Sequence, residues 1–130
     1  MGKHYDSMVN YKTLVLGASI NPQRYSHQAV LSLMKFGIEV VPMGFKKGRI
    51  LEKVIVMPFQ PQTNIHTVSV YLSPMRQEDY YEFILSLKPK RVLFNPGTEN
   101  PILSQKLNDN CILWENACTL VLLSTNQYQT

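Results

Sequence analysis

Apolar and polar positions follow two different periods along the chain. Short apolar runs rich in Val, Ile and Leu predict six strands, over residues 12–16, 38–42, 54–57, 67–72, 91–94 and 111–114. Longer segments with apolar residues at helical spacing predict four helices, over residues 26–36, 75–87, 102–108 and 117–124. Strands that alternate with helices form parallel sheets covered on both faces, so this order predicts a Rossmann-like three-layer α/β sandwich with a mainly parallel sheet of five or six strands.

Turn-forming residues mark the ends of several of these elements. Gly37 follows the first predicted helix and is expected to close it as a C-terminal cap, and Pro89 prevents the second helix from continuing. Pro58 and Pro61 indicate an extended loop. The polar residues 125–130 are expected to fray.

Four of the predicted turns follow strands and should meet at one edge of the sheet. They begin at Gly17, Met43, Ser73 and Asn95. In open α/β sheets, ligands bind beyond the carboxyl ends of the strands, near the point where the strand order reverses. The sequence therefore predicts one crevice built from four loops.

Length and charge narrow the class of ligand. The 130 residues are expected to form a single domain, residues 1–130, with its core at about 12–124. The net charge of +4 favours an anionic partner, and the dispersed Lys and Arg residues favour a small phosphorylated molecule over a nucleic acid.

No apolar run approaches the roughly 20 residues of a membrane helix, and no signal-peptide core follows the N-terminus, so we expect a cytoplasmic protein with no membrane partner. Cys111 and Cys118 are expected to be free thiols, and the sequence leaves open whether the chain is a monomer or a homo-oligomer.

The turn after the first strand has the composition of an anion site. Gly17, Ala18 and Ser19 carry small side chains that let a pyrophosphate approach the backbone, and the first turn of the next helix offers unpaired N–H groups. Pro22 stiffens this loop, while Arg24 and Ser26 supply donors. The alternative is that Gly17 merely permits a tight turn between strand and helix.

The residues after the second strand bear on which nucleotide would fit. An NAD site needs an acid there to accept a hydrogen bond from the ribose hydroxyl, but this strand ends in Pro42, Met43 and Gly44. The basic turn at residues 46–49 follows. This pattern favours an adenosine that carries an additional phosphate, as in coenzyme A or NADP, although the basic turn could equally be a solvated loop.

Together these motifs resemble the CoA-binding-domain family, the stand-alone relatives of the CoA-binding domain of succinyl-CoA synthetase. The resemblance spans roughly residues 12–124 and is most specific in the G-A-S-x-x-P-x-R-x-S run that begins at Gly17; further support comes from the Val40-Val41-Pro42 strand end, the Asn95-Pro96-Gly97-Thr98-Glu99 turn and Ala117-Cys118-Thr119. Many relatives read Pro-Val-Asn-Pro where this chain reads Pro42-Met43-Gly44-Phe45. The resemblance implies a Rossmann-like fold that binds CoA through its adenosine and pyrophosphate.

The turn positions and the resemblance together predict the cofactor-binding residues. These are Gly17, Ala18, Ser19, Pro22, Arg24, Tyr25, Ser26, Pro42, Met43, Gly44, Lys46, Ser73, Asn95, Pro96 and Gly97.

The sequence contains no clear catalytic constellation. No acid or nucleophile stands at a spacing typical of a catalytic pair from any of the three histidines, His4, His27 and His66. Cys118, near the start of the last predicted helix, is expected to be a small core residue; the alternative is a thiol whose pKa the helix dipole lowers. Glu99 and Glu115 are expected to cap helices, with orientation of a ligand as the alternative. Tyr71, Tyr80 and Tyr81 are expected to pack with their hydroxyls outward. We therefore expect non-catalytic binding of coenzyme A or acyl-CoA. The alternatives are an NADP-binding protein or reductase, a CoA-using transferase, and an interaction module with a vestigial nucleotide pocket.

Overall fold

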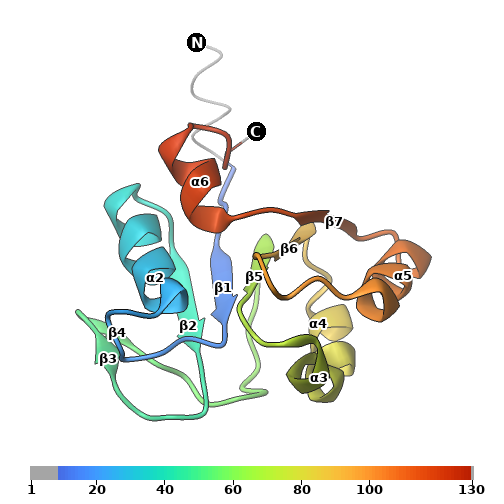
Figure 1. Cartoon of the computed structure of the whole chain (residues 1–130), viewed down its shortest axis with the longest axis horizontal. Helices are drawn as coiled ribbons and strands as arrows, with labels where there is room; N and C mark the ends of the chain where they lie inside the picture. Colours follow the sequence, from blue (N-terminus) through green and yellow to red (C-terminus); the bar gives the residue numbers. More distant parts are fainter. Residues whose placement is uncertain (1–8, 130) are drawn as a thin grey trace.

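A five-stranded parallel sheet forms the centre of the molecule (Figure 1). The computed structural model describes residues 9–129. The strands stand in the order β2-β1-β5-β6-β7, with bounds β1 (Thr13–Leu16), β2 (Val40–Met43), β5 (Thr67–Val70), β6 (Arg91–Phe94) and β7 (Leu113–Asn116). Counted along the chain, these five strands run 2-1-3-4-5, so the strand order reverses between β1 and β5.

Helices cover both faces of this sheet, as Figure 1 shows. Their bounds are α2 (Tyr25–Lys35), α3 (Pro74–Gln77), the 3-10 turn η1 (Glu78–Tyr80), α4 (Tyr81–Leu87), α5 (Pro101–Asp109) and α6 (Thr119–Ser124). Leu14 and Leu16 pack with α4 and α5 residues on one face, whereas Val15 packs with α2 and α6 residues on the other. Successive side chains of a strand point to opposite faces, so one apolar strand supplies both cores. The Rossmann-like three-layer sandwich is confirmed.

The sheet has five strands rather than six, because the apolar run at 54–57 does not join it. Residues 49–54 instead form a separate antiparallel hairpin of β3 (Arg49–Ile50) and β4 (Lys53–Val54), and Val56 makes one isolated bridge to Met43. Ile55 is buried, but Val54 and Met57 are exposed. The run is therefore too short and too exposed on its flanks to form a further central strand.

One helix and one strand have different limits in the structure from those predicted, each for a local reason. The helix predicted at 75–87 divides into α3, η1 and α4, and the buried side chain of Gln77 turns inward at the first junction. The last strand begins at Leu113 rather than at Cys111, because Cys111 has a φ of 59° and its N–H bonds to the carbonyl of Asn108 at the end of α5. A left-handed residue cannot lie within a strand.

The chain end also differs from expectation. Residues 125–129 do not all lie free in solvent, because Tyr128 is 2% exposed and packs in the core under α6. Its hydroxyl shares a hydrogen bond with Thr13, and Arg91 donates from Nη2 to its carbonyl oxygen over 2.8 Å. The prediction that this segment frays failed because one of its otherwise polar residues, Tyr128, is aromatic and packs in the core. Within residues 9–129, no helix has the length and apolar character needed to cross a membrane.

Candidate functional site

A cavity of about 730 Å³ opens at the carboxyl edge of the sheet, where the strand order reverses. The turns after β1 and β5 form its floor, and the loop after β2, the start of α2, the helix α3 and the turn after β6 surround it. Its size falls within the roughly 300–1,000 Å³ of small-molecule sites. The lining residues are Gly17, Ala18, Ser19, Ile20, Gln23, Arg24, Tyr25, Ser26, Phe45, Lys46, Tyr71, Leu72, Ser73, Arg76, Pro96 and Thr98.

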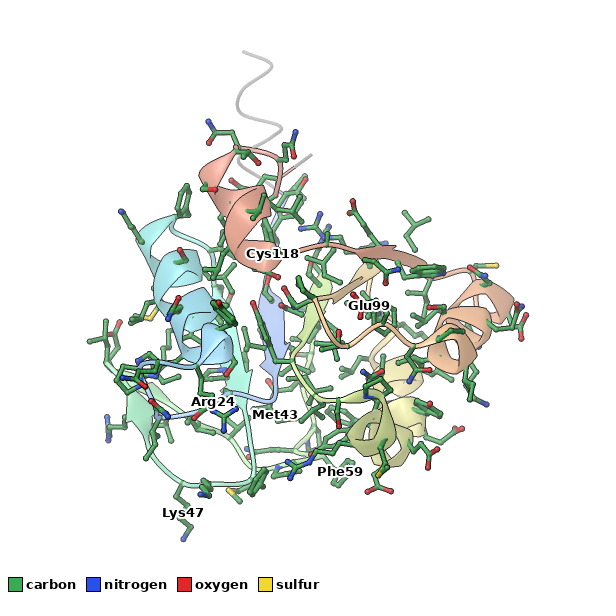
Figure 2. The ribbon with its side chains drawn as sticks, viewed as in Figure 1. Arg24, Met43, Lys47, Phe59, Glu99 and Cys118 are labelled. Atoms are coloured by element: carbon green, nitrogen blue, oxygen red, sulfur yellow. The ribbon has the colours of Figure 1, made fainter. Side chains whose placement is uncertain are left out.

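The first turn of α2 faces this cavity without a cap. Arg24 occupies the N-cap position with extended backbone angles, and no side chain accepts a hydrogen bond there. Tyr25 and Ser26, the first two helical residues, line the cavity. Free N–H groups at a helix start and the positive end of its dipole together favour an anion. Figure 2 shows Arg24 below this first turn, at the edge where β1 and β2 end.

The turn between β1 and α2 has less free backbone than the sequence suggested. The N–H groups of Gly17 and Ala18 both donate to the carbonyl of Met43, each over 2.9 Å. Gly17 has a φ of 100°, and a Cβ at this position would lie 3.2 Å from the Tyr71 carbonyl carbon. Glycine is therefore required for the turn itself, and an anion would have to find its donors at the start of α2.

The charged lining residues are all cationic. Arg24, Lys46 and Arg76 line the cavity, and its lining contains no Asp or Glu. Within residues 9–129 a single ion pair occurs, between Lys12 and Glu39, before the starts of β1 and β2. The cationic groups of the cavity are thus uncompensated, which gives it the charge of an anion site.

Nine of the predicted binding residues line the cavity. They are Gly17, Ala18, Ser19, Arg24, Tyr25, Ser26, Lys46, Ser73 and Pro96. Six others lie outside the lining: Pro22, Pro42, Met43, Gly44, Asn95 and Gly97.

The residues of β2 and the loop after it support the cavity from behind. Met43 is fully buried in the core. A Cβ on Gly44 would lie 2.5 Å from the Ala18 carbonyl oxygen, so glycine at this position allows the two loops to touch. The departure from the Pro-Val-Asn-Pro pattern therefore coincides with a close backbone contact.

Asn95 is a connecting residue rather than a lining residue. Its Nδ2 donates to Ser69 Oγ over 2.9 Å and to the Val70 carbonyl over 3.0 Å, while its Oδ1 accepts from the Thr119 N–H over 2.8 Å. All polar atoms of its side chain are thus engaged with β5 and the start of α6. This placement ties three elements together just behind the cavity.

Seven lining residues did not follow from the sequence. They are Ile20, Gln23, Phe45, Tyr71, Leu72, Arg76 and Thr98. Thr98 and Leu72 are brought together by the buried amide of Gln77, whose Nε2 donates to the carbonyls of both residues over 2.8 and 2.9 Å. Asn100 donates in turn to Gln77 Oε1. In the sequence, the only sign of these hydrogen bonds was a polar residue, Gln77, within the helix predicted at 75–87.

Tyr71 does not turn its hydroxyl outward as expected. Its hydroxyl is buried and has no hydrogen-bond partner in the described part of the chain. Burial raises the pKa of the Tyr71 phenol above its ordinary value, because the charged form would lose its solvation. The hydroxyl of Tyr81 also differs from expectation, since it accepts a hydrogen bond from Asn100.

The remaining candidates lie outside the cavity lining. Cys118 is half-buried at the N-cap of α6 rather than in the core. Glu99 accepts a hydrogen bond from the Gly97 N–H, and Asn100 caps α5 in its place. Glu115 is exposed within β7. Across residues 9–129, no group of three or more His, Cys, Asp or Glu is placed to hold a metal ion.

A second hollow of about 260 Å³ lies beside α5 and β7. Its lining includes Glu99, Gln105 and Trp114 and has no Lys or Arg. The larger cavity therefore has the better composition for an anionic ligand.

Comparison with known proteins agrees with this fold. A crystal structure of an uncharacterized protein is 44% identical, covers 92% of this chain and 98% of its own, and superposes with a TM-score of 0.88. A protein from Thermus thermophilus (21% identity, TM-score 0.81, covering 96% and 95%) and a hypothetical protein from Pyrococcus horikoshii OT3 (22%, 0.80, covering 95% and 87%) share the fold. No curated protein matches the chain.

The family-level match covers the cavity and all five strands. The sequence model of the CoA binding domain matches residues 11–124, from just before β1 to the end of α6. The turn after β1, the start of α2 and the turns after β5 and β6 all fall within this match. The chain belongs to the CoA-binding domain family.

Proposed function

We propose that this protein binds coenzyme A, or an acyl-CoA, and does not itself catalyse a reaction on it. The observation that carries the proposal is the cavity at the reversal of strand order, whose lining combines an uncapped helix start with three uncompensated cations. CoA carries a pyrophosphate and a further phosphate on its ribose. Membership of the CoA-binding domain family supports the same ligand.

The start of α2 is the best place for the pyrophosphate. The N–H groups of its first turn have no capping side chain, and the helix of 11 residues contributes a dipole with its positive end at the cavity. Arg24 adds a planar guanidinium that can donate two parallel hydrogen bonds to phosphate oxygens. The small residues Gly17 and Ala18 leave space beside it.

The composition of the lining supports binding without catalysis. It contains no His, Cys, Asp or Glu, the residue types that most often act as acid, base or nucleophile. The Tyr71 phenol is protonated at neutral pH even at its ordinary pKa, and burial raises that pKa further, so it offers no phenolate base. A reductase or transferase acting in this cavity would have to take its proton donor from the Tyr, Lys or Ser residues of the lining or from a group outside it.

Native mass spectrometry of freshly purified protein, followed by calorimetric titration with CoA, acetyl-CoA and NADP, tests the proposal. We expect CoA or acetyl-CoA to bind and NADP to bind more weakly. No bound CoA and no heat with either CoA species, together with binding of NADP, would show that the assignment is wrong. A mass for two chains in the same spectrum would reveal a homo-oligomer.

The variant Arg24→Ala tests the position of the pyrophosphate. Loss of a charge-assisted contact should weaken CoA binding by about 1.5–3 kcal/mol. Arg49→Ala is the matched control, because Arg49 is an exposed arginine outside the cavity lining. Equal affinities of the two variants would remove Arg24 from the site.

A further inference from the structure

The two edges of the sheet differ in how their backbone groups are covered. At the β2 edge, the Val56 N–H donates to the Pro42 carbonyl over 2.9 Å, and the Gly44 N–H donates to the Val56 carbonyl over 3.0 Å. Pro42 itself has no N–H to expose. At the β7 edge, no segment within residues 9–129 pairs with the outer side of the strand, and Figure 1 shows β7 as the outermost strand. The β7 edge is therefore the one open to an added strand.

The hydrogen-bond pattern of β7 identifies which of its backbone groups face outward. The Ala117 N–H donates to the Phe94 carbonyl of β6 over 3.0 Å. Because bonding alternates along a parallel strand, the odd-numbered residues of β7 also bond to β6. The N–H and C=O groups of Trp114 and Asn116 then point away from the sheet. They can bond to an extended peptide that lies alongside.

A hollow of about 260 Å³ lies beside this open edge, on the face where α5 packs. One stripe of α5, residues 101, 104, 105 and 108, lines it, and β7 contributes Trp114 and Asn116. These two β7 residues are the ones whose backbone groups face outward. Peptides that add to a sheet edge place alternate side chains in pockets beside the edge strand. The hollow and the open edge thus form one groove.

The charge of the groove indicates which side chain would enter it. Glu99 is the only charged residue of its lining, and Figure 2 shows Glu99 near β7. Glu99 Oε1 accepts a hydrogen bond from the Gly97 N–H over 3.0 Å, which leaves Oε2 for a further donor. Neither Glu99 nor the exposed Glu115 has an ion-pair partner in the described part of the chain. A Lys or Arg side chain would complement this groove.

The occupant that fits these features is a basic strand from another protein. On the face of β7 opposite the hollow, Leu113 is 75% exposed, so it can cover an apolar side chain of an added strand. A second copy of this chain would bring its own β7 to the edge. That strand contains no Lys or Arg and offers no cation to Glu99.

We propose that β7 and α5 form a docking site for an extended, basic segment of another protein, which adds to the sheet as a sixth strand. Main-chain hydrogen bonds to Trp114 and Asn116 hold the segment. A Lys or Arg side chain reaches Glu99 on the α5 face, and an apolar side chain covers Leu113 on the other face. The inference goes beyond the proposed function, because the groove and the cavity share no lining residue.

A peptide of four Lys-Val repeats tests the site, with four Glu-Val repeats as the control. In an extended chain, Lys and Val then lie on opposite faces. Trp114 is the only tryptophan of the chain and lines the groove, so its fluorescence reports binding. We expect saturable binding of the Lys-Val peptide and at least about fivefold weaker binding of the Glu-Val peptide. No binding of the Lys-Val peptide, or equal binding of both, would overturn the inference.

Amide hydrogen exchange separates strand addition from contacts of side chains alone. The bound Lys-Val peptide should slow exchange at Trp114 and Asn116 and leave Leu113 and Glu115 unchanged, because the latter two already bond to β6. No slowing, or equal slowing at all four amides, would refute an added strand. Slow exchange at Trp114 and Asn116 without peptide, together with a mass for two chains, would assign the edge to a second copy and also refute the proposal.

Two variants test the charge and the backbone separately. Glu99→Lys should weaken binding of the Lys-Val peptide about five- to tenfold. Glu52→Lys makes the same charge change at the exposed turn between β3 and β4 and should leave binding unchanged. Equal affinities of these two variants would contradict the role of Glu99.

Asn116→Pro removes one outward N–H and leaves the ladder with β6 in place, so it should weaken peptide binding about fivefold. Asn116→Ala keeps this N–H and is the matched control. Circular dichroism verifies that each variant folds, and equal binding by the two folded variants would refute the main-chain contact.

Discussion

Asn95 offers the sharpest test of how the cavity is held together. Its side chain makes three hydrogen bonds behind the cavity, two as donor to β5 and one as acceptor from the first residue of α6. In Asn95→Ala, Ser69 Oγ keeps its hydrogen bond to Thr119 Oγ1, over 2.8 Å. The backbone N–H of Thr119, a fully buried residue, loses its partner.

These contacts set the size of the effect. An orphaned buried donor costs about 1–3 kcal/mol, and each lost neutral hydrogen bond about 1 kcal/mol. We therefore expect Asn95→Ala to lower the free energy of unfolding by about 2–4 kcal/mol. With a urea m-value of about 2 kcal/mol per molar, the unfolding midpoint should fall by roughly 1–2 M.

The assay is urea unfolding followed by circular dichroism, with Asn116→Ala as the control. Asn116 is an exposed asparagine on the edge strand β7, and its loss should change stability by less than about 0.5 kcal/mol. The reasoning is refuted if the two variants unfold at the same urea concentration. A stable Asn95→Ala protein that no longer binds CoA would instead assign Asn95 to the ligand.

Two further predictions concern the opposite edge of the sheet. Tyr128→Ala should lower stability by about 3–5 kcal/mol, because a buried side chain that stacks on the Arg91 guanidinium and bonds to Thr13 is lost; an unchanged melting temperature would contradict this packing. Burial, together with the charges of Arg91 and Lys90, lowers the pKa of His66 below 6.5 in the folded protein. The unfolded chain then binds the proton more tightly, so stability should fall as the pH drops below 6.5, and His66→Gln should flatten this dependence in urea midpoints measured at pH 7.5 and 5.5.

The strands and the first helix could be predicted because their signals are local. Buried parallel strands need continuous apolar runs, and the runs at β1 and β6 have that composition. Gly37, with a φ of 74°, closes α2 as expected, and its N–H bonds to the Met34 carbonyl. The hairpin of β3 and β4 was missed because its turn depends on Leu51, a residue type with no preference for its φ of 54°.

The residues of the cavity that could be predicted from the sequence are those that come directly after a strand. Gly17 and Ser73 line the cavity because parallel strands end at one edge, which strand order and handedness dictate. Arg76 was missed because it lies in a helix, where a cation normally indicates a solvated face. Only the folded chain shows that its guanidinium lies over the ring of Phe45.

The sequence by itself therefore determined the fold class and the family, because each depends on residue types at short spacing. Only the tertiary structure shows which backbone N–H groups beside the cavity have no hydrogen-bond partner. The N–H groups of Gly17 and Ala18 are already bonded to Met43, so the N–H groups beside the cavity that lack a capping side chain are those of the first turn of α2. The tertiary structure also decided that Asn95 supports the cavity while Phe45 lines it, since both roles depend on contacts between residues far apart in the chain.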